Sequence, residues 1–425
     1  MIKDGYLYDR DDALDIRIRD GQIAEIDSQL DPEDGTQVID ADGNLVSPPF
    51  VDSHVHLDKA LEASGDRFPR HNDGGTDFSK IGAFEQQHYN EISSEELTRN
   101  AVEAGKLAVS NGTLYMRTHV TVGEDVDGTK TMESILEARE RLDDILDLQI
   151  VALPTPAIVR SERTKEIVEE CLEMGADLIG GSDPATRGGD ISRTLETWFE
   201  LAEEYDVEID PHIQHPGTLG MNVLNRMAEE TIDHDYQGRV TASHSYCMAE
   251  LDGKEYDADT PGLSDTILKS NREAQLDRSI ETFADAGMKF VTCHPSTRPG
   301  MPIHDLLDAD VPLGWGSDNI QDWVIRHSQP DALQGALVNA FKLDYNQYSF
   351  ASNQGLDHLW NMATREGARV LSIQDEYGLR EGTPGNLIVF DEQSPQWAVL
   401  NQATREYVVK AGQIIVEDDE LQVDV

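Results

Sequence analysis

The sequence predicts an α/β protein that consists of a (β/α)8 barrel and a small β-domain built from both ends of the chain. Three observations support this prediction. Short β-rich runs alternate with helical segments between residues 45 and 318, most of these runs end in a polar residue, and both ends of the chain alternate apolar runs with turns. We assign residues 48–374 to the barrel and residues 1–47 plus 375–425 to the β-domain.

Eight β-rich runs are expected to form the parallel strands of the barrel, because each is short and is followed by a segment of helical periodicity. In chain order they are Leu45–His56, Thr113–His119, Leu148–Pro154, Ala176–Asp183, Val207–His212, Arg239–His244, Lys289–His294 and Val311–Asp318. The active site of such a barrel lies at the carboxyl ends of the strands. The polar residues that end these runs are therefore candidates for the site.

The segments between the runs carry signals for helix ends. Residues 95–110 form one predicted helix, because Ser93 and Glu96 make a capping box before it and Gly112 follows it. A second predicted helix ends at Gly175. Its apolar face consists of Ile167, Val168, Cys171 and Leu172.

The two ends of the chain show short strands separated by turns. In the N-terminal part, Asp20-Gly21, Asp34-Gly35 and Asp42-Gly43 mark turns. The C-terminal strands are expected at Leu387–Phe390, Tyr407–Val409 and Ile414–Val416. These two sets of strands predict one small domain into which the barrel is inserted.

The chain is strongly acidic along its whole length. It has 82 acidic against 34 basic residues and a net charge of −48, and no segment concentrates that charge. Such a surface repels nucleic acid and anionic membranes, so neither is expected as a partner. A dispersed acidic surface with 11 lysines against 23 arginines resembles halophilic proteins, in which high ionic strength screens the repulsion. An acidic face for a basic partner is the less favoured alternative.

Other features of the whole chain favour the cytoplasm. Cys171, Cys247 and Cys293 are odd in number and far apart, so they form neither a CxxC motif nor a disulfide framework. The first residues lack a basic region followed by an apolar run, and no segment approaches the roughly 18 apolar residues of a membrane span. We expect a cytoplasmic protein and leave a homo-oligomer open.

The tripeptide His54-Val55-His56 at the end of the first run carries the strongest chemical signal. Residues i and i+2 of a strand point to the same face, so both imidazoles would enter one pocket. The pair is either half of a catalytic metal site or polar surface. Further polar residues at strand ends, His212, His244 and Asp318, favour the metal site, because several nitrogen and oxygen ligands with a water molecule are typical of catalytic Zn²⁺ or Fe²⁺.

Segments spread over nearly the whole chain resemble the amidohydrolase superfamily, and within it the cytosine deaminase branch. They are "PPFVDSHVHLDK", "YMRTHV", "LDLQIVALP", "DPHIQH", "TASHS", "GSDN", "GTPGNLIVF" and "VVKAGQIIV". The resemblance implies a distorted (β/α)8 TIM barrel with a terminal β-sandwich. It also implies one divalent metal ion.

The resemblance implies roles for the residues at the strand ends. His54, His56, His212 and Asp318 would bind the metal, and Asp318 would also take the proton of the attacking water. His244 would contact that water or the substrate.

The distribution of lysines favours a single metal. Amidohydrolases with two metals often bridge them with a carbamylated lysine on strand four, but no lysine occurs between Lys165 and Lys254. The fourth run ends instead in Asp183. We place Asp183 with the candidate substrate-binding residues, as a partner that orients a ligand histidine; an ordinary turn residue is the alternative.

Three positions depart from the cytosine deaminase pattern. His215 stands where those enzymes have a glutamate that shuttles a proton to the ring nitrogen, and a histidine can also shuttle protons near neutral pH. Thr155 stands where they have a glutamine that holds the pyrimidine edge, and Asn319 stands where an aspartate is usual. We treat His215 as a catalytic candidate and the other two as candidates for substrate binding. The departures argue against cytosine itself.

Lys59 is a further candidate for substrate binding, since it follows His56 by three residues as in the related isopropylammelide hydrolases, which act on s-triazine rings. It would hold a ring oxygen; a solvated cation on a loop is the alternative. Residues 62–90 are too many for an ordinary loop between a strand and a helix. We expect a cap over the site, with Gln86, Gln87 and His88 as weaker candidates for substrate contact.

These features together predict a metal-dependent hydrolytic deaminase. Metal-activated hydroxide is expected to attack a ring carbon that bears an amino or alkylamino group, in a small cytosine-like or s-triazine-like heterocycle. Two alternatives stay open. One is hydrolysis of a cyclic amide C–N bond without release of ammonia, and the other is a non-enzymatic acidic metal-binding protein.

Overall fold

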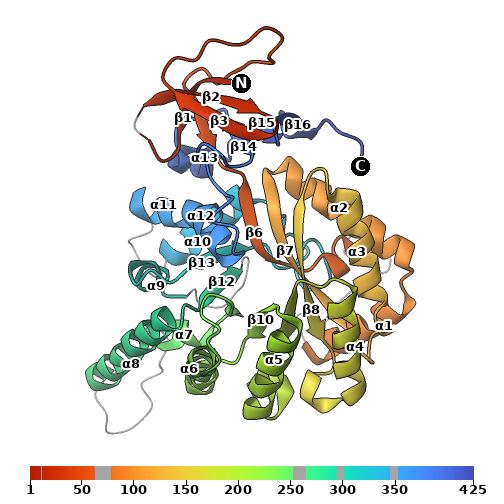
Figure 1. The fold of residues 1–425 in the computed structure, drawn as a ribbon. Coiled ribbons are helices and arrows are strands. Elements are labelled where there is room, and N and C mark those ends of the chain that lie inside the picture. Colours follow the sequence, from red (N-terminus) through yellow and green to blue (C-terminus); the bar gives the residue numbers. More distant parts are fainter. Residues whose placement is uncertain (11, 63–77, 252–264, 294–300, 345–352) are drawn as a thin grey trace.

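The computed structural model describes residues 1–10, 12–62, 78–251, 265–293, 301–344 and 353–425. Eight parallel strands form the barrel, and nine further strands form a second sheet. In Figure 1 the second sheet lies at the top of the view, above the barrel strands and the helices around them. The predicted fold class is confirmed.

The barrel strands are hydrogen-bonded in the order in which they occur along the chain. They are β6 (Phe50–Val55), β7 (Thr113–Val122), β8 (Asp147–Pro154), β9 (Leu178–Gly181), β10 (Glu208–Ile213), β11 (Thr241–His244), β12 (Lys289–Cys293) and β13 (Leu313–Gly316). Each predicted run overlaps one of these strands. His294, the last residue of the seventh predicted run, lies outside the described residues.

Two predicted boundaries were wrong. The first run divides at Pro48-Pro49, so that β5 (Leu45–Ser47) joins the second sheet and β6 begins the barrel. Proline lacks the N–H that a strand ladder needs, and two in succession separate the strands. The second run continues beyond His119 to Val122, which places His119 inside β7 and not at its end.

The barrel closes between the ends of β13 and β6. The Asp318 N–H donates to the His54 carbonyl oxygen, and the His56 N–H donates to the Asp318 carbonyl oxygen, both at 2.8 Å. Gly316 permits this close approach, because a Cβ at that position would lie 2.7 Å from His54 Cβ. The seam therefore brings the His54-Val55-His56 tripeptide beside Asp318.

Helices surround the barrel strands, and the last helix of the chain lies beside the second sheet (Figure 1). They are α1 (Phe78–Glu91), α2 (Ser94–Ser110), α3 (Lys130–Leu142), α4 (Glu162–Met174), α5 (Ile191–Tyr205), α6 (Gly217–Asp233), α7 (Cys247–Leu251), α8 (Asp265–Asp285), α9 (Ile303–Asp308), α10 (Ala332–Asp344), α11 (Asn353–Met362), α12 (Arg365–Val370) and α13 (Pro395–Asn401). Among the described residues, no helix is both long enough and apolar enough to cross a membrane.

The two predicted helix boundaries with clear signals are confirmed. At the start of α2, the Ser93 hydroxyl accepts a hydrogen bond from the Glu96 N–H at 3.2 Å. Helix α4 ends at Gly175, whose φ of +114° is a left-handed conformation that glycine adopts readily. The four apolar residues predicted for the inner face of α4 are buried.

The second sheet combines strands from both ends of the chain, as predicted. Its order is β17, β16, β15, β14, β5, β1, β2 and β3, with β4 paired to β1. The bounds are β1 (Ile2–Leu7), β2 (Ala13–Arg19), β3 (Gln22–Asp27), β4 (Ile39–Asp40), β14 (Leu387–Phe390), β15 (Arg405–Lys410), β16 (Gln413–Glu417) and β17 (Glu420–Leu421).

Alternate residues of this sheet enter two different cores, since successive strand residues point to opposite faces. Val46 and Val389 belong to an apolar cluster of the sheet itself. Their neighbours Leu45 and Ile388 belong to the large core that also fills the space between the barrel and its helices. The barrel therefore packs directly on one face of the terminal sheet.

Candidate metal and active site

Four candidate metal ligands meet at the carboxyl ends of the barrel strands. His56 Nε2 lies 3.2 Å from His212 Nε2 and 3.6 Å from Asp318 Oδ1. His54 Nε2 lies 4.0 Å from the same carboxylate oxygen. The structure thus brings together residues from β6, β10 and the end of β13, although up to 264 positions separate them in the chain (318 − 54).

Hydrogen bonds turn one nitrogen of His54, on β6, and one of His56, directly after β6, toward this meeting point. His56 Nδ1 lies 3.2 Å from the carbonyl oxygen of His119, and His54 Nδ1 lies 2.9 Å from Ser243 Oγ. A carbonyl oxygen only accepts, so His56 carries its proton on Nδ1 and presents a lone pair at Nε2. His54 Nε2 is buried and has no hydrogen-bond partner among the described residues. Such an atom needs a ligand, and three imidazoles with one carboxylate suit a divalent ion.

Burial sets the charge of these ligands. Burial, reinforced by the neighbouring histidines, holds the pKa of His54 and of His212 well below its ordinary value. Burial and the charge of Lys59 do the same to the pKa of His56. Neutral imidazole is the form that binds metals. Burial also raises the pKa of Asp318 to about 6, against the opposing effect of Lys59.

Lys59 is buried beside the site, so its interpretation as a solvated loop cation does not hold. Its Nζ donates to Glu85 Oε1 of α1 at 3.1 Å. Burial alone would lower the pKa of Lys59, but the carboxylates of Glu85, Asp322, Asp58 and Asp318 outweigh burial and raise that pKa above its ordinary value. A positive charge is therefore held next to the candidate metal ligands. No pattern in the sequence indicates the role of Glu85, because that role depends on how α1 packs.

His244 lies next to the four ligands at the end of β11. Its ring centroid lies 4.9 Å from that of His54 and 5.0 Å from that of His212. Its Nδ1 lies 3.2 Å from the Tyr246 hydroxyl. The backbone has a φ of +71°, a strained conformation for histidine that is typical of functional sites. His244 is thus adjacent to the meeting point of the ligands.

His119 is a further member of the cluster that the sequence analysis did not include among the site residues. Its ring centroid lies 4.0 Å from that of His54 and 4.8 Å from that of His212. The side chain is fully buried, and within the part of the chain that the structure describes neither ring nitrogen has a hydrogen-bond partner. The available signal was its place in the second β-rich run. Because β7 continues past it, His119 lies deeper in the barrel than a strand-end residue.

Asp183 holds the loop after β10 in place. Its Oδ2 accepts hydrogen bonds from the backbone N–H groups of Gln214 and His215, both at 2.7 Å. Its Oδ1 accepts two more, from Ala185 and Thr186. These four bonds occupy the carboxylate, so the structure favours a positioning role for Asp183 over direct contact with a substrate.

The three positions that depart from the cytosine deaminase pattern differ in their surroundings. His215 is half-buried, and its Nδ1 lies 2.7 Å from the Pro216 carbonyl oxygen, which leaves the lone pair on Nε2. Asn319 is buried and donates from Nδ2 to Asp322 Oδ2 at 2.5 Å. Thr155 is half-buried directly after β8. All three lie at the carboxyl ends of barrel strands.

The predicted cap contains helix α1, while residues 63–77 of that segment lie outside the described residues. Gln86 and Gln87 are exposed, and Gln87 Nε2 donates to Glu91 on the same helix. His88 is buried with its ring centroid 4.7 Å from that of Trp323. The side chain of α1 that reaches Lys59 is Glu85, not one of the three candidates.

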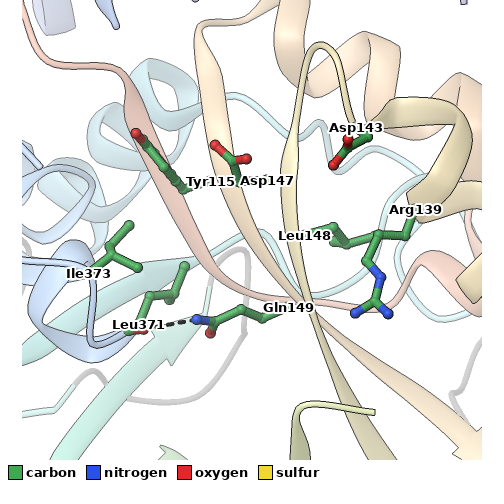
Figure 2. Close-up of a pocket in the computed structure, with 8 residues that line it drawn as sticks. All are labelled: Tyr115, Arg139, Asp143, Asp147, Leu148, Gln149, Leu371 and Ile373. Carbon is green, nitrogen blue, oxygen red and sulfur yellow. Dashed lines mark hydrogen bonds between the residues drawn. The ribbon is translucent and has the colours of Figure 1, made fainter. Parts of the chain in front are cut away.

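A cavity of about 230 Å³ lies at the other end of the barrel strands. Figure 2 shows Tyr115, Asp147 and Gln149 around it, with Gln149 hydrogen-bonded to the Leu371 carbonyl oxygen at 2.9 Å. These residues belong to the first halves of β7 and β8, whereas the histidine cluster lies toward the carboxyl ends. The cavity is therefore separate from the candidate metal site.

Comparison with known proteins identifies the family. Residues 37–416 match the amidohydrolase family. The chain is 39% identical over 423 residues to N-isopropylammelide isopropyl amidohydrolase of Pseudomonas sp. (strain ADP). This match covers 99% of this chain and 97% of that protein.

Two solved structures agree with the fold. N-isopropylammelide isopropylaminohydrolase from Burkholderia multivorans has a TM-score of 0.84 and 27% identity, covering 99% of this chain and 98% of that one. A 5-methylcytosine deaminase from Klebsiella pneumoniae, liganded with 5-fluorocytosine, has a TM-score of 0.82 and 25% identity, covering 100% and 99%. The resemblance inferred from the sequence segments is confirmed. The chain belongs to the amidohydrolase family and is a hydrolase that acts on carbon–nitrogen bonds.

Proposed function

We propose that this amidohydrolase cleaves the bond between a nitrogen heterocycle and its amino or alkylamino substituent, with one bound Zn²⁺ or Fe²⁺. The observation that carries the proposal is the convergence of His54, His56, His212 and Asp318 on one buried point beside the charged Lys59. The names of the relatives, an isopropylammelide amidohydrolase and a methylcytosine deaminase, support a small heterocycle as substrate.

The four converging residues would hold the metal ion. When bound, such an ion acts as a Lewis acid that activates a water molecule at neutral pH. A single ion is supported by β9, which offers no lysine to bridge two metals, and by Asp183, whose carboxylate is already occupied.

Proton transfer falls to residues of the chain. Asp318, whose carboxylate lies 3.6 Å from His56 Nε2, would accept the proton of the attacking water. His244, adjacent to the ligands, would stabilise the oxyanion that forms at the attacked carbon. His215, on the loop that Asp183 holds, would pass a proton to the ring nitrogen or the leaving amine.

The substrate would be an s-triazine-like keto heterocycle rather than cytosine. Lys59 offers a buried positive charge, which suits a ring oxygen that carries negative charge. His215 replaces the glutamate of cytosine deaminases, and Asn319 directs its amide group to Asp322. Thr155 and Asn319 would then contact the ring from the ends of β8 and β13.

Removal of a metal ligand tests the metal and the reaction together. We expect His212→Ala and Asp318→Ala each to lose both bound metal, measured by elemental analysis, and turnover. His234→Ala is the matched control. His234 lies at the end of α6, away from the cluster, and pairs with Glu203. If both ligand variants keep stoichiometric metal and full activity, the proposed site is wrong.

A substrate panel tests the chemistry. Release of ammonia and of alkylamine would be followed on N-isopropylammelide, ammelide, cytosine, isoguanine and a pterin in buffer with high KCl. We expect amine release with kcat/KM highest for an s-triazine. Activity confined to ring opening of cyclic amides, with no amine released, would contradict the proposal.

A further inference from the structure

We infer that Asp210, acting through the Ser243 hydroxyl, is the positioning residue that fixes the metal ligand His54 in its binding form. The inference rests on the proposed metal site and adds residues beneath the ligands to it. Asp210 lies on β10, Ser243 on β11 and His54 on β6, and all three are fully buried.

The count of hydrogens along this chain leaves one arrangement. Ser243 Oγ donates its only hydrogen to Asp210 Oδ1 at 2.8 Å. The same oxygen lies 2.9 Å from His54 Nδ1, and it can therefore only accept there. His54 must carry its proton on Nδ1, which leaves the lone pair on Nε2. Nε2 is buried, lies 4.0 Å from Asp318 Oδ1 and has no hydrogen-bond partner in the described parts of the chain.

Arg117 keeps the Asp210 carboxylate in place. Its Nη1 donates to Asp210 Oδ2 at 3.0 Å and to Thr241 Oγ1 at 3.2 Å, and its Nη2 donates to the Val370 carbonyl oxygen at 3.2 Å. A buried guanidinium is always charged and needs an anion nearby. Asp210 thus serves two groups at once, since one oxygen holds Arg117 and the other holds Ser243.

His119 limits the rotation of His54 from a second side. The two rings lie 4.0 Å apart with an angle of 35° between their planes, and His119 Nε2 lies 3.7 Å from Asp210 Oδ2. The ring of His54 is therefore held by packing as well as by the Ser243 hydrogen bond.

The two histidines of the tripeptide, His54 and His56, are oriented by different kinds of group. His56 is oriented by a backbone carbonyl, which no substitution removes. His54 depends on a side-chain hydroxyl and on the carboxylate behind it. Partners of this kind typically change metal affinity by about 10- to 100-fold when they are lost.

The test measures metal affinity rather than activity. Metal-free wild type, Ser243→Ala, Ser243→Thr and Asp210→Asn would be titrated with Zn²⁺ in competition with a chromophoric chelator. We expect Ser243→Ala and Asp210→Asn to bind Zn²⁺ 10- to 100-fold more weakly, and Ser243→Thr to stay within a few-fold of wild type because it keeps the hydroxyl. The visible absorption of the Co²⁺ forms should change in the same two variants.

Ser134→Ala is the matched control, because Ser134 is also a buried serine but lies on α3, where its hydroxyl donates to the backbone carbonyl oxygen of Lys130. It should bind Zn²⁺ like wild type. If Ser243→Ala and Asp210→Asn also bind like wild type, the inference is overturned.

A measurement on the unsubstituted protein covers the case in which a variant fails to fold. Nitrogen NMR of the metal-free wild type, labelled at histidine, reports the tautomer of each ring. We expect the proton of His54 on Nδ1; a proton on Nε2 would overturn the inference.

The two proposals fail separately. If His212→Ala loses Zn²⁺ while Ser243→Ala binds it normally, only the positioning role is wrong. If wild type itself binds no divalent metal, the proposed function and the inference both fall.

Discussion

At the scale of single residues, Asn319 and Asp322 form a buried pair in which only one partner is charged. Asn319 Nδ2 donates to Asp322 Oδ2 at 2.5 Å, while Asp322 Oδ1 accepts from the N–H groups of Val324 and Ile325. Burial raises the pKa of Asp322, and Lys59 opposes that effect. An aspartate at position 319 would face Asp322 as a second carboxylate, so we expect the amide to stabilise the folded chain.

Exchanging the two residues tests that expectation. We expect Asn319→Asp to lower the free energy of unfolding by about 3 kcal/mol at pH 8, because a buried donor is lost and like charges meet. The double variant Asn319→Asp, Asp322→Asn restores one donor and one carboxylate and should recover most of the loss. Urea denaturation of both variants and of Asp322→Asn alone measures the coupling. Purely additive losses would contradict the pairing.

The histidine cluster makes the metal-free protein sensitive to acid. Burial holds the pKa of His54, His56, His119 and His212 well below 6.5 in the folded state. These rings therefore take up protons only on unfolding, so their contribution to stability is present above pH 6.5 and is lost as the pH falls. Asp318 acts in the opposite sense, because its pKa is raised from 3.8 to about 6 and the folded state holds that proton more tightly.

The expected slope follows from the proton count. Near pH 5.5 unfolding should take up about two protons net. Four are taken up by the histidines, and about one each is released by Asp318 and by buried Asp52, whose pKa is raised to about 7. The slope is then about 3 kcal/mol per pH unit. Urea denaturation of the metal-free protein between pH 7 and pH 5 in 2 M KCl measures it. Saturating Zn²⁺ should raise the free energy of unfolding near pH 7, because the ion binds the folded state. A stability that stays level from pH 7 to pH 5 would show that these imidazoles are not buried and neutral.

At the scale of elements, Asp183 joins β9 to the loop after β10. One carboxylate oxygen caps the short turn Pro184–Gly188, and the other holds the backbone of Gln214 and His215. The loop that carries the proposed proton donor is therefore fixed by a residue that does not itself need to contact the substrate.

Asp183→Asn should loosen that loop, since an asparagine has one acceptor oxygen in place of two. We expect a loss of about 1–3 kcal/mol in stability and at least a tenfold lower kcat with KM nearly unchanged. Ser93→Ala is the comparison, because it removes the cap of α2 at a cost of about 1 kcal/mol and leaves kcat unchanged. Equal effects of the two substitutions on kcat would argue against a positioning role for Asp183.

At the scale of the whole molecule, charge is the dominant feature. A net charge of −48 creates repulsion between surface carboxylates that is screened over about 10 Å at 0.1 M salt and about 3 Å at 1 M. Stability should therefore depend strongly on ionic strength.

We expect the free energy of unfolding to rise by a few kcal/mol between 0.1 M and 2 M KCl, since each relieved like-charge pair is worth a few tenths of a kcal/mol. Thermal or urea denaturation across that range measures the effect. Sorbitol at matched osmolality serves as the uncharged control and should stabilise the protein less. The same gain in sorbitol would mean that screening is not the cause.

Local signals in the sequence determined much of this protein. Alternating β-rich and helical segments predicted the eight barrel strands, Ser93 and Gly175 marked the ends of two helices, and the His54-Val55-His56 tripeptide indicated the candidate metal site. Each of these signals acts over a few residues, because strand period, helix capping and the shared face of residues i and i+2 are local properties of the backbone.

Only the tertiary structure decided which distant side chains support the site. Ser243 reaches His54 across 189 positions of the chain, Glu85 reaches Lys59 because α1 packs against it, and His119 joins the cluster because β7 runs three residues further than predicted. These contacts depend on strand register and barrel closure, which set distances between elements. Sequence patterns specify the faces of an element, and packing alone specifies what each face meets.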